Sequence, residues 1–216
     1  WNRALAASPL PLTAIATIMT NLARLRAFVA ETTRTVEAHG GDEAALLAIL
    51  KPSLAGLVAD DDWLPQAYAA PHPQFYRQYL LYADPLERWS VVSFVWGPGQ
   101  TTPVHDHTVW GLVGVLRGAE ISTSFIRASD GRLIAQPQER IEAGSVVAVS
   151  PRLGDVHAIA NAYVDRTSIS IHVYGGNIGG IRRHVFDAAT GAVKPFVSGY
   201  SNAALPNLWA RTAETA

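Results

Sequence analysis

The sequence of 216 residues contains no cysteine. This absence excludes disulfide bonds, thiolate zinc sites and cysteine nucleophiles. A metal ion bound to this chain must therefore be held by histidine, aspartate, glutamate or backbone oxygen atoms. A chain without cysteine also fits the reducing cytoplasm, where we predict that the protein works.

Charged residues and long apolar runs are scarce as well. Charged residues make up 16% of the chain, and the formal net charge is -1. A net charge so close to zero provides no strong attraction to nucleic acid or to an anionic membrane. No apolar run approaches the ~18 residues of a membrane-spanning helix. The first residues lack the basic segment followed by an apolar block that is typical of a signal peptide, so none is predicted. We expect neither nucleic acid nor a membrane as a partner, and these features predict no oligomeric state.

Hydrophobic residues, by contrast, make up 49% of the chain, which is enough for one domain over residues 1–216. Residues 1–73 are predicted to be mainly helical. A first helix is indicated by apolar residues at steps of three and four: Leu12, Ile15, Ile18, Met19, Leu22, Leu25 and Val29. A His-Gly-Gly sequence at 39–41 ends this helix. Asp42 then starts a second helix over Ala44–Leu50, before Pro52.

Residues 74–200 have a different texture, with short segments rich in Val, Ile, Tyr and Trp between turn residues, and 201–216 form a tail. Strands are predicted at Phe75–Leu81, Trp89–Trp96, Val104–Leu116, Ile121–Arg127, Arg132–Ile134, Ser145–Val149, His157–Asn161, Ser168–Tyr174, Ile181–Phe186 and Ala192–Val197. Many short strands after a helical start favour an α+β protein whose bulk is a β-sandwich or barrel. The helices are expected to pack on that barrel.

Two histidines stand one residue apart in GPGQTTPVHDHTVWGLVGVLRG, which runs from Gly97 to Gly118. On a strand, His105 and His107 would point to the same side and Asp106 to the other. Such a pair either binds a metal ion or lines a pocket. A third histidine, His157, lies in a similar glycine-flanked segment, PRLGDVHAIAN.

These two segments resemble the two motifs of the cupin superfamily. The first motif is matched by Gly99, His105, His107 and Gly118, and the second by Pro151, Gly154, His157 and Asn161. Gly111 stands where the first motif usually has a glutamate ligand, and one extra residue separates Pro151 from Gly154. The resemblance implies a mainly β (α+β) fold, a cupin double-stranded β-helix barrel (jelly-roll) with N-terminal helices packed on it.

A closer resemblance follows from HDHT, GDVH and SIHVY in this order. Over roughly Phe75 to Phe186 the chain resembles the thiol dioxygenases of the cysteine dioxygenase type I family. The resemblance implies that a small thiol is oxidised by O2 to its sulfinic acid at mononuclear non-haem Fe(2+). The implied iron ligands are His105, His107 and His157. Three ligands on one side of the metal leave about three octahedral positions open for thiol and O2.

The resemblance also implies an outer-sphere chain on the strand Ser168–Tyr174. Ser170, His172 and Tyr174 alternate along this strand, so their side chains face one side. A hydroxyl, an imidazole and a phenol in line can form a hydrogen-bonded relay that brings the Tyr174 hydroxyl beside the iron. The candidates for apolar lining are Trp96, Trp110 and Val173, although core packing is the favoured role for any one of them.

Two departures from the animal-type enzymes bear on the substrate. Gly111 occupies the place of a cysteine that those enzymes link to the tyrosine. Gln78 stands where they use an arginine to bind the substrate carboxylate, with Arg77 facing away. This pattern looks like the bacterial 3-mercaptopropionate dioxygenase branch, in which an arginine after the Ser–His–Tyr strand lies at the substrate end of the pocket. Arg183 fits that position better than Arg182, although a solvated surface pair explains two adjacent arginines equally well.

Three alternatives remain open at this point. L-cysteine is the alternative substrate within the same family, with Gln78 and Gly111 weighing against it. Another cupin metalloenzyme, such as a sugar isomerase or a manganese decarboxylase, is disfavoured by the missing glutamate and the Ser–His–Tyr strand. A non-catalytic cupin that binds a small ligand is disfavoured by the intact set of three histidines.

Overall fold

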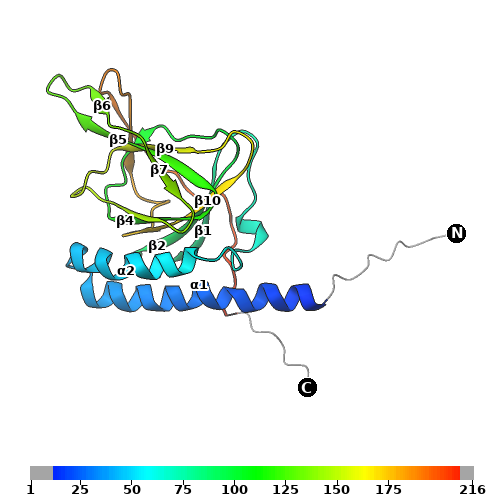
Figure 1. Ribbon diagram of the computed structural model, residues 1–216. Helices are drawn as coiled ribbons and strands as arrows, with labels where there is room; N and C mark the ends of the chain where they lie inside the picture. The colour runs from blue at the N-terminus through cyan, green and yellow to red at the C-terminus, as the bar shows by residue number, and fades with distance from the viewer. Residues whose placement is uncertain (1–11, 210–216) are drawn as a thin grey trace.

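The computed structural model describes the backbone of residues 12–209 and the side chains of residues 22–209. Its helices are α1 (Leu12–His39) and α2 (Glu43–Val58), followed by the short 3-10 helix η1 (Gln66–Tyr68). The strands are β1 (Arg77–Ala83), β2 (Ser90–Trp96), β3 (Val104–His105), β4 (Gly111–Arg117), β5 (Ala119–Arg127), β6 (Leu133–Ala135), β7 (Glu139–Glu142), β8 (Val146–Val149), β9 (His157–Asn161), β10 (Ser168–Tyr174), β11 (Arg183–Phe186) and β12 (Val193–Phe196). In Figure 1 the two helices lie side by side beneath the strands.

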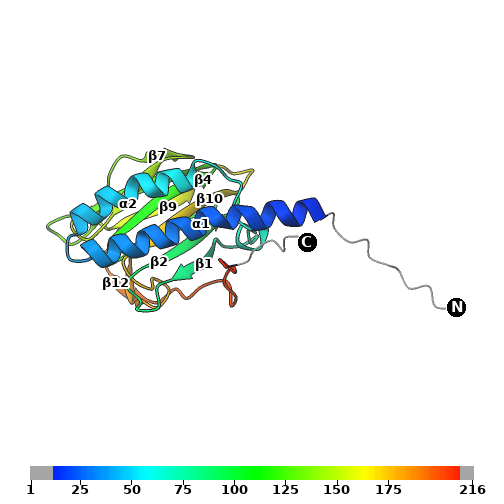
Figure 2. The same cartoon turned by 90° about the horizontal axis from the view of Figure 1, so that it is seen from below.

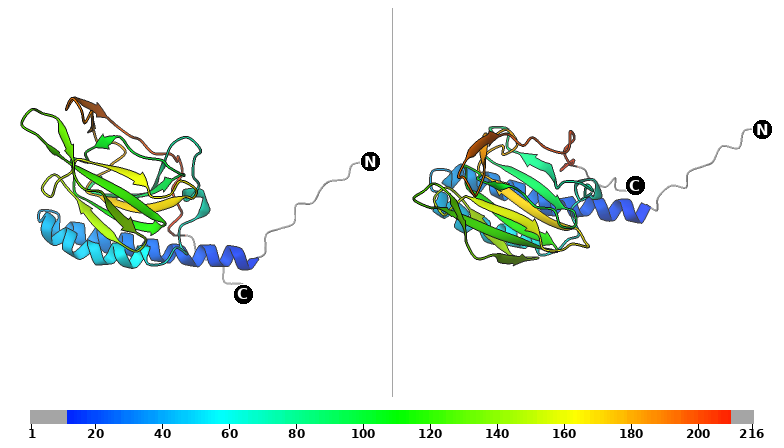
Figure 3. Two further views of the ribbon diagram at one scale, coloured as in Figure 1. Left: turned by 45° about the horizontal axis from the view of Figure 1, so that its top comes forward. Right: turned by 90° about the horizontal axis from the view of Figure 1, so that it is seen from above.

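The strands form two antiparallel sheets. One sheet has the order β1-β2-β10-β4-β8, and the other has the order β12-β11-β3-β9-β5-β6, with β7 also paired to β5. Strands far apart in the sequence are neighbours, as β2 and β10 are, because the chain crosses repeatedly between the sheets. Figure 3 shows the barrel that the two sheets enclose. The cupin jelly-roll barrel with N-terminal helices, which the sequence predicts, is confirmed.

Strand β10 lies in the middle of the first sheet and is buried on both faces. Because side chains alternate along a strand, its residues divide into two sets. The apolar set packs with α1 and α2 in the larger core and consists of Ile169, Ile171 and Val173. The other set faces the interior of the barrel and consists of Ser170, His172 and Tyr174. Figure 2 shows the helices covering the outer face of this sheet.

Helix α2 fixes the sheet from outside. Asp42 caps the helix, because its side chain accepts a hydrogen bond from the Ala45 N–H at 3.1 Å. The buried stripe of the helix consists of Leu46, Leu50, Leu54, Leu57 and Val58. Gly114 on β4 allows the close approach, because a Cβ atom there would lie 3.0 Å from Val58 and 3.1 Å from Leu54. The helix therefore rests directly on the strand that pairs with β10.

Two predicted helix features need comment. The second helix does not end before Pro52 but continues through it to Val58. Proline removes one helical hydrogen bond, but the apolar stripe continues beyond it and keeps the last turns on the sheet. In the first helix, Leu22, Leu25 and Val29 are buried as expected, whereas the predicted stripe from Leu12 to Met19 lies outside the residues whose side chains are described. Neither helix, over its described residues, has the length and hydropathy of a membrane span.

One predicted strand is wrong, and one strand was not predicted. Val104–Leu116 is not one strand, because β3 ends at His105 in one sheet and β4 begins at Gly111 in the other. The chain crosses between the sheets in the loop between them, where Thr108 has a φ of 61°. Strand β7 was not predicted, because its sequence ERIE buries only Ile141 and carries charge at the other positions.

Candidate metal centre and its surroundings

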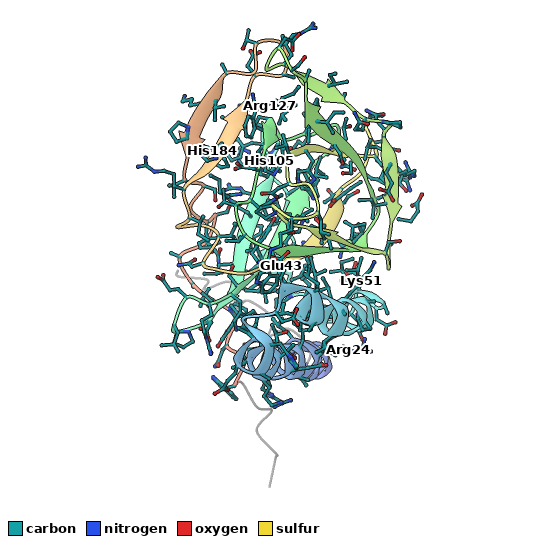
Figure 4. All side chains as sticks on the ribbon, turned by 90° about the vertical axis from the view of Figure 1, so that its left-hand side faces the viewer. Arg24, Glu43, Lys51, His105, Arg127 and His184 are labelled. Atoms are coloured by element: carbon teal, nitrogen blue, oxygen red, sulfur yellow. The ribbon has the colours of Figure 1, made fainter. Side chains whose placement is uncertain are left out.

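Three histidines converge inside the barrel. One nitrogen of each of His105, His107 and His157 lies within 4.8 Å of the others, and this is the cluster of potential metal ligands found in the described residues. His105 and His157 are direct cross-strand partners on β3 and β9. His107 lies in the loop after β3, so the predicted strand setting is wrong for this residue, and the turn of the loop brings its ring back to His105. Figure 4 shows His105 within the barrel, away from the helices that carry Arg24 and Lys51.

The hydrogen bonds of these histidines leave one nitrogen of each ring for a metal. His105 Nδ1 donates to the Pro103 carbonyl at 3.0 Å, and His107 Nδ1 donates to Asp155 at 2.7 Å. His157 Nε2 is buried and has no hydrogen-bond partner among the described residues. An unpaired buried nitrogen is costly in a protein interior, so these rings fit a metal ion better than a plain core.

Burial keeps these rings in the form that binds metals. Burial, together with the neighbouring His107, lowers the pKa of His105 to about 3. Burial and the adjacent histidines also lower the pKa of His157 well below its ordinary value. Because metals bind neutral imidazole, no proton has to be displaced from these two rings near neutral pH.

Asp155 orients the loop histidine, and the sequence analysis missed this residue. Its Oδ1 accepts from His107 Nδ1, and its Oδ2 accepts from the backbone N–H groups of His107 and Thr108, each at 2.8 Å. Burial raises the pKa of this carboxyl, but the hydrogen bonds from His107 outweigh that effect and lower it. A carboxylate behind a metal-binding histidine fixes its tautomer and ring orientation. The signal was the Asp of GDVH, two residues before His157.

Asp106 faces away from the cluster, as its position between the two histidines predicts. Its Oδ1 accepts from the His184 backbone N–H at 2.7 Å, and its Oδ2 accepts from His184 Nδ1 at 2.8 Å. In Figure 4, His184 lies at the outer edge of the barrel. Asp106 therefore ties the loop after β3 to strand β11 and contributes no oxygen to the three-histidine cluster.

The expected outer-sphere residues form one hydrogen-bonded chain. Ser170 Oγ lies 2.8 Å from His172 Nε2, and His172 Nδ1 lies 2.7 Å from the Tyr174 hydroxyl. Trp96 Nε1 donates to Ser170 Oγ at 3.1 Å. The ring of Tyr174 stacks on His107 with the centroids 5.3 Å apart. Burial raises the pKa of Tyr174, so its phenol stays protonated and remains a hydrogen-bond donor beside the metal centre.

A cavity of about 200 Å³ opens in front of the three histidines. Its apolar wall includes Phe94, Trp96, Ile159, Val185 and Phe196. Of the three apolar candidates predicted from the sequence, Trp96 lines this cavity. Val173 and Trp110 instead pack in the larger core, which is the role that the sequence favoured for each of them. A small, mostly apolar space beside polar groups is typical of a site for a small molecule.

Unlike Arg182, which is exposed to solvent, Arg183 is buried and lines the cavity. Its guanidinium lies 4.6 Å above the Phe196 ring, and Nη2 donates to Ser198 Oγ at 2.6 Å. Its Nε is buried without a hydrogen-bond partner in the part of the chain that is described. No ion pair joins it to a described carboxylate. Burial lowers the pKa of Arg183, as expected for a cation that lacks a counter-charge.

Gln78 also lines the cavity. Its Nε2 donates to the Gly199 carbonyl at 2.9 Å, which holds the amide in place. Arg77 lies on the other face of β1, where its guanidinium is 5.3 Å from the Phe75 ring. Gln78 therefore faces the cavity and Arg77 faces away from it, as predicted from the sequence.

We expect Asp155→Asn to weaken metal binding roughly 10- to 100-fold, because the charged partner of the His107 ring is lost. Titration of the metal-free protein with Fe(2+) under anaerobic conditions measures the effect, and His157→Ala should show the larger loss expected of a ligand.

Asp106→Asn is the matched control, since it makes the same change beside the same histidines but on a carboxyl that holds His184. Its affinity should stay close to that of the unmodified protein. Equal affinities for the two asparagine variants would contradict the role given to Asp155.

Similarity to solved structures is weak. The chain is 14% identical to a protein from Thermus thermophilus, with a TM-score of 0.41, over 51% of this chain and 92% of that one. It is 21% identical to a protein with a double-stranded β-helix domain from Klebsiella pneumoniae, with a TM-score of 0.39, over 53% and 89%. It is 14% identical to a cupin superfamily protein from Desulfitobacterium hafniense, with a TM-score of 0.41, over 55% and 94%. These values carry no information about the reaction.

The comparison with protein families is more informative. The family described as cysteine dioxygenase type I matches residues 63–187, which is more than half of the chain. The matched range contains the three clustered histidines, Asp155, the hydrogen-bonded chain on β10 and Arg183. The protein belongs to the cysteine dioxygenase type I family.

Proposed function

We propose that this protein is an Fe(2+)-dependent thiol dioxygenase that converts 3-mercaptopropionate to 3-sulfinopropionate with O2. The observation that carries the proposal is a buried guanidinium without a counter-charge, which shares one small cavity with three clustered imidazoles. The imidazoles suit a divalent metal, and the guanidinium suits a carboxylate. Membership in the cysteine dioxygenase type I family supports the thiol as the group that lies between them.

The donor set fits iron in the +2 state. Three imidazole nitrogens are suitable ligands for Fe(2+) and leave coordination positions open on the cavity side. When bound, Fe(2+) supplies a Lewis acid that favours the thiolate form of the substrate and an electron-rich site for O2. The protein residues hold the thiol near this site, exclude water and supply hydrogen bonds from Tyr174.

The substrate carboxylate is assigned to Arg183. A buried cation without a counter-charge is unfavourable, and a carboxylate that enters the cavity removes this cost. Arginine also binds carboxylates with two parallel hydrogen bonds, and its Nε is unpaired in the described part of the chain. Tyr76 and Tyr174 also line the cavity, and their hydroxyl groups are potential donors of further hydrogen bonds to the acid.

The cavity favours a thiol acid without an amino group. None of its lining residues, all of which are described, is an aspartate or a glutamate. The ammonium group of L-cysteine would therefore enter a space that already contains Arg183 and has no carboxylate to pair with it. Gln78 is neutral and its Nε2 is already bound to Gly199. 3-Mercaptopropionate brings the same thiol and carboxylate without the second positive charge. The cytoplasmic location expected from the sequence stays a prediction.

We expect kcat/KM to be higher for 3-mercaptopropionate than for L-cysteine, and Gln78→Arg to shift the ratio toward L-cysteine by adding a second carboxylate clamp. Oxygen uptake and sulfinate formation with 3-mercaptopropionate, L-cysteine and cysteamine measure these ratios. A tenfold preference for L-cysteine, about 1.4 kcal/mol in transition-state binding, would assign the protein to the cysteine dioxygenases proper. No uptake with any thiol would reject the enzyme class and favour another cupin function.

Substitution of Arg183 by Gln should raise KM for 3-mercaptopropionate by roughly 10- to 100-fold, because a charge-assisted pair worth about 1.5–3 kcal/mol is lost. Arg182→Gln removes the same charge one residue away, from a side chain that is exposed, and should leave KM almost unchanged. Initial rates at saturating O2 give both values. If both variants raised KM equally, a general effect of surface charge would explain the result and the carboxylate site would be wrong.

Tyr174→Phe and His172→Asn should keep bound iron, since neither side chain is assigned as a ligand, but should lower kcat by roughly 10- to 1,000-fold. Metal content by atomic absorption, measured on the same samples as turnover, separates the two effects. Loss of iron in either variant would mean that the residue supports the metal directly.

A further inference from the structure

A single glutamate lies deep in the barrel and has no role in the site described so far. Glu120 on β5 is fully buried, and neither of its carboxylate oxygens has a hydrogen-bond partner among the described residues. It also forms no ion pair within the described part of the chain. Burial raises its pKa to about 7, and the nearby Ser170 hydroxyl and Trp96 indole oppose this rise.

Glu120 lies at the inner end of the Ser–His–Tyr chain. The Ser170 hydroxyl and the Trp96 N–H face its carboxyl, but neither completes a hydrogen bond to it, because Trp96 donates to Ser170 and Ser170 bonds to His172. From the cavity inward, the order of groups is therefore the Tyr174 phenol, the His172 imidazole, the Ser170 hydroxyl and the Glu120 carboxyl. A small rotation of the Ser170 hydroxyl toward Glu120 would close the last link.

The other elements around Glu120 add no charge. Its cross-strand partners are Asn161 on β9 and Ile141 on β7. The amide of Asn161 donates to three backbone carbonyls and is already satisfied. The charged residues of β7, which are Glu139, Arg140 and Glu142, are exposed. The titratable groups connected to Glu120 through Ser170 are therefore His172 and Tyr174, both on β10.

The proposed reaction releases a proton inside a buried site. The balance is R–SH + O2 → R–SO2⁻ + H⁺, in which the S–H and O–O bonds break and two S–O bonds form. O2 is reduced by the sulfur, so no other reductant is needed. A sulfinic acid is ionised at neutral pH and does not keep the proton. No carboxylate lines the cavity among its described residues, and burial disfavours protonation of His105 and His157.

We propose that Glu120 is the internal acceptor of this proton, which reaches it through Tyr174, His172 and Ser170. The inference rests on the proposed thiol oxidation. The thiol proton passes to the Tyr174 oxygen, the Tyr174 proton to His172 Nδ1, the Nε2 proton of His172 to Ser170, and the Ser170 proton to Glu120. His172 stays neutral and changes tautomer, and Glu120 ends as a carboxylic acid. Glu120 does not contact the substrate and acts on the reaction only through the other residues of this chain.

The first test uses metal-free protein and needs no turnover. Infrared difference spectra between about pH 5 and pH 9 should contain a carboxylic acid C=O band that disappears with a midpoint near 7. The band should be missing in Glu120→Gln, shifted in frequency in Ser170→Ala and unchanged in Glu142→Gln, which alters an exposed glutamate. The inference would be overturned if the band did not titrate in this range, or if its frequency were unchanged in Ser170→Ala.

The second test is the pH profile of kcat. In the unmodified enzyme, kcat should fall as the pH drops below about 7, because protonated Glu120 cannot accept another proton. Glu120→Gln should lower kcat roughly 10- to 100-fold, the size of a typical acid–base contribution, and should lose this acidic limb while KM for 3-mercaptopropionate stays within about twofold. Glu120→Asp should recover part of the rate and the limb. A merely structural glutamate would leave the shape of the profile unchanged in Glu120→Gln, and that result would overturn the inference.

The two tests separate this inference from the proposed function. Thiol oxidation without an infrared titration of Glu120 would overturn the inference alone. If Glu120 titrates in the infrared spectra but no thiol is oxidised, the proposed function is wrong, and a thiol is not the source of the proton. Thermal melting of each variant checks that it is folded, and Glu120→Asp serves in place of Glu120→Gln if the latter is unstable.

Discussion

The burial of strand β10 on both faces is the constraint that joins the fold of this protein to its site. On the outer face, three apolar residues pack against α1 and α2 in the larger core. On the inner face, three polar residues are almost fully buried, and they satisfy one another along the strand. Buried polar groups are tolerated when they are paired. The helices are therefore part of the site, because they make the centre of this sheet inaccessible from outside and keep its inner hydrogen-bonded chain dry.

Arg183 and Glu120 are ionisable residues buried in the barrel interior, and neither forms an ion pair among the described residues. Isolated charges are costly in such surroundings. Each group has a different way to lower this cost. Arg183 has a pKa too high for ready deprotonation, so it needs an anion from outside. Glu120 can take a proton instead, because burial brings its pKa to about 7. In the proposed reaction, the carboxylate of the substrate would neutralise Arg183, and the released proton would neutralise Glu120.

Much of the site could be predicted because its residues lie at fixed spacings. Ser170, His172 and Tyr174 alternate on one strand, and strand geometry brings their side chains together wherever the strand lies. The predicted setting of His107 was wrong, because the chain leaves β3 at His105 and crosses between sheets in a loop. Asp155 and Glu120 were missed for a related reason. Asp155 stands in the GDVH motif, but the groups that face Asp155 and Glu120 come from distant parts of the chain, and neither the spacing nor the composition of the sequence identifies them. The same limit applies to Pro52, which tertiary packing keeps inside a helix.

Because the chain has no cysteine, Tyr174 has to be held in place without a covalent link. In the animal-type enzymes that the sequence resembles, a cysteine at the place of Gly111 links covalently to the tyrosine. Here a Cβ atom at Gly111 would lie only 2.8 Å from the Tyr174 ring, so the ring occupies the space of the missing side chain. His107 stacks on the same ring, and His172 binds its hydroxyl. The phenol is therefore held by non-covalent contacts in place of a covalent bond. These contacts are the packing against Gly111, the stacking on His107 and the hydrogen bond to His172.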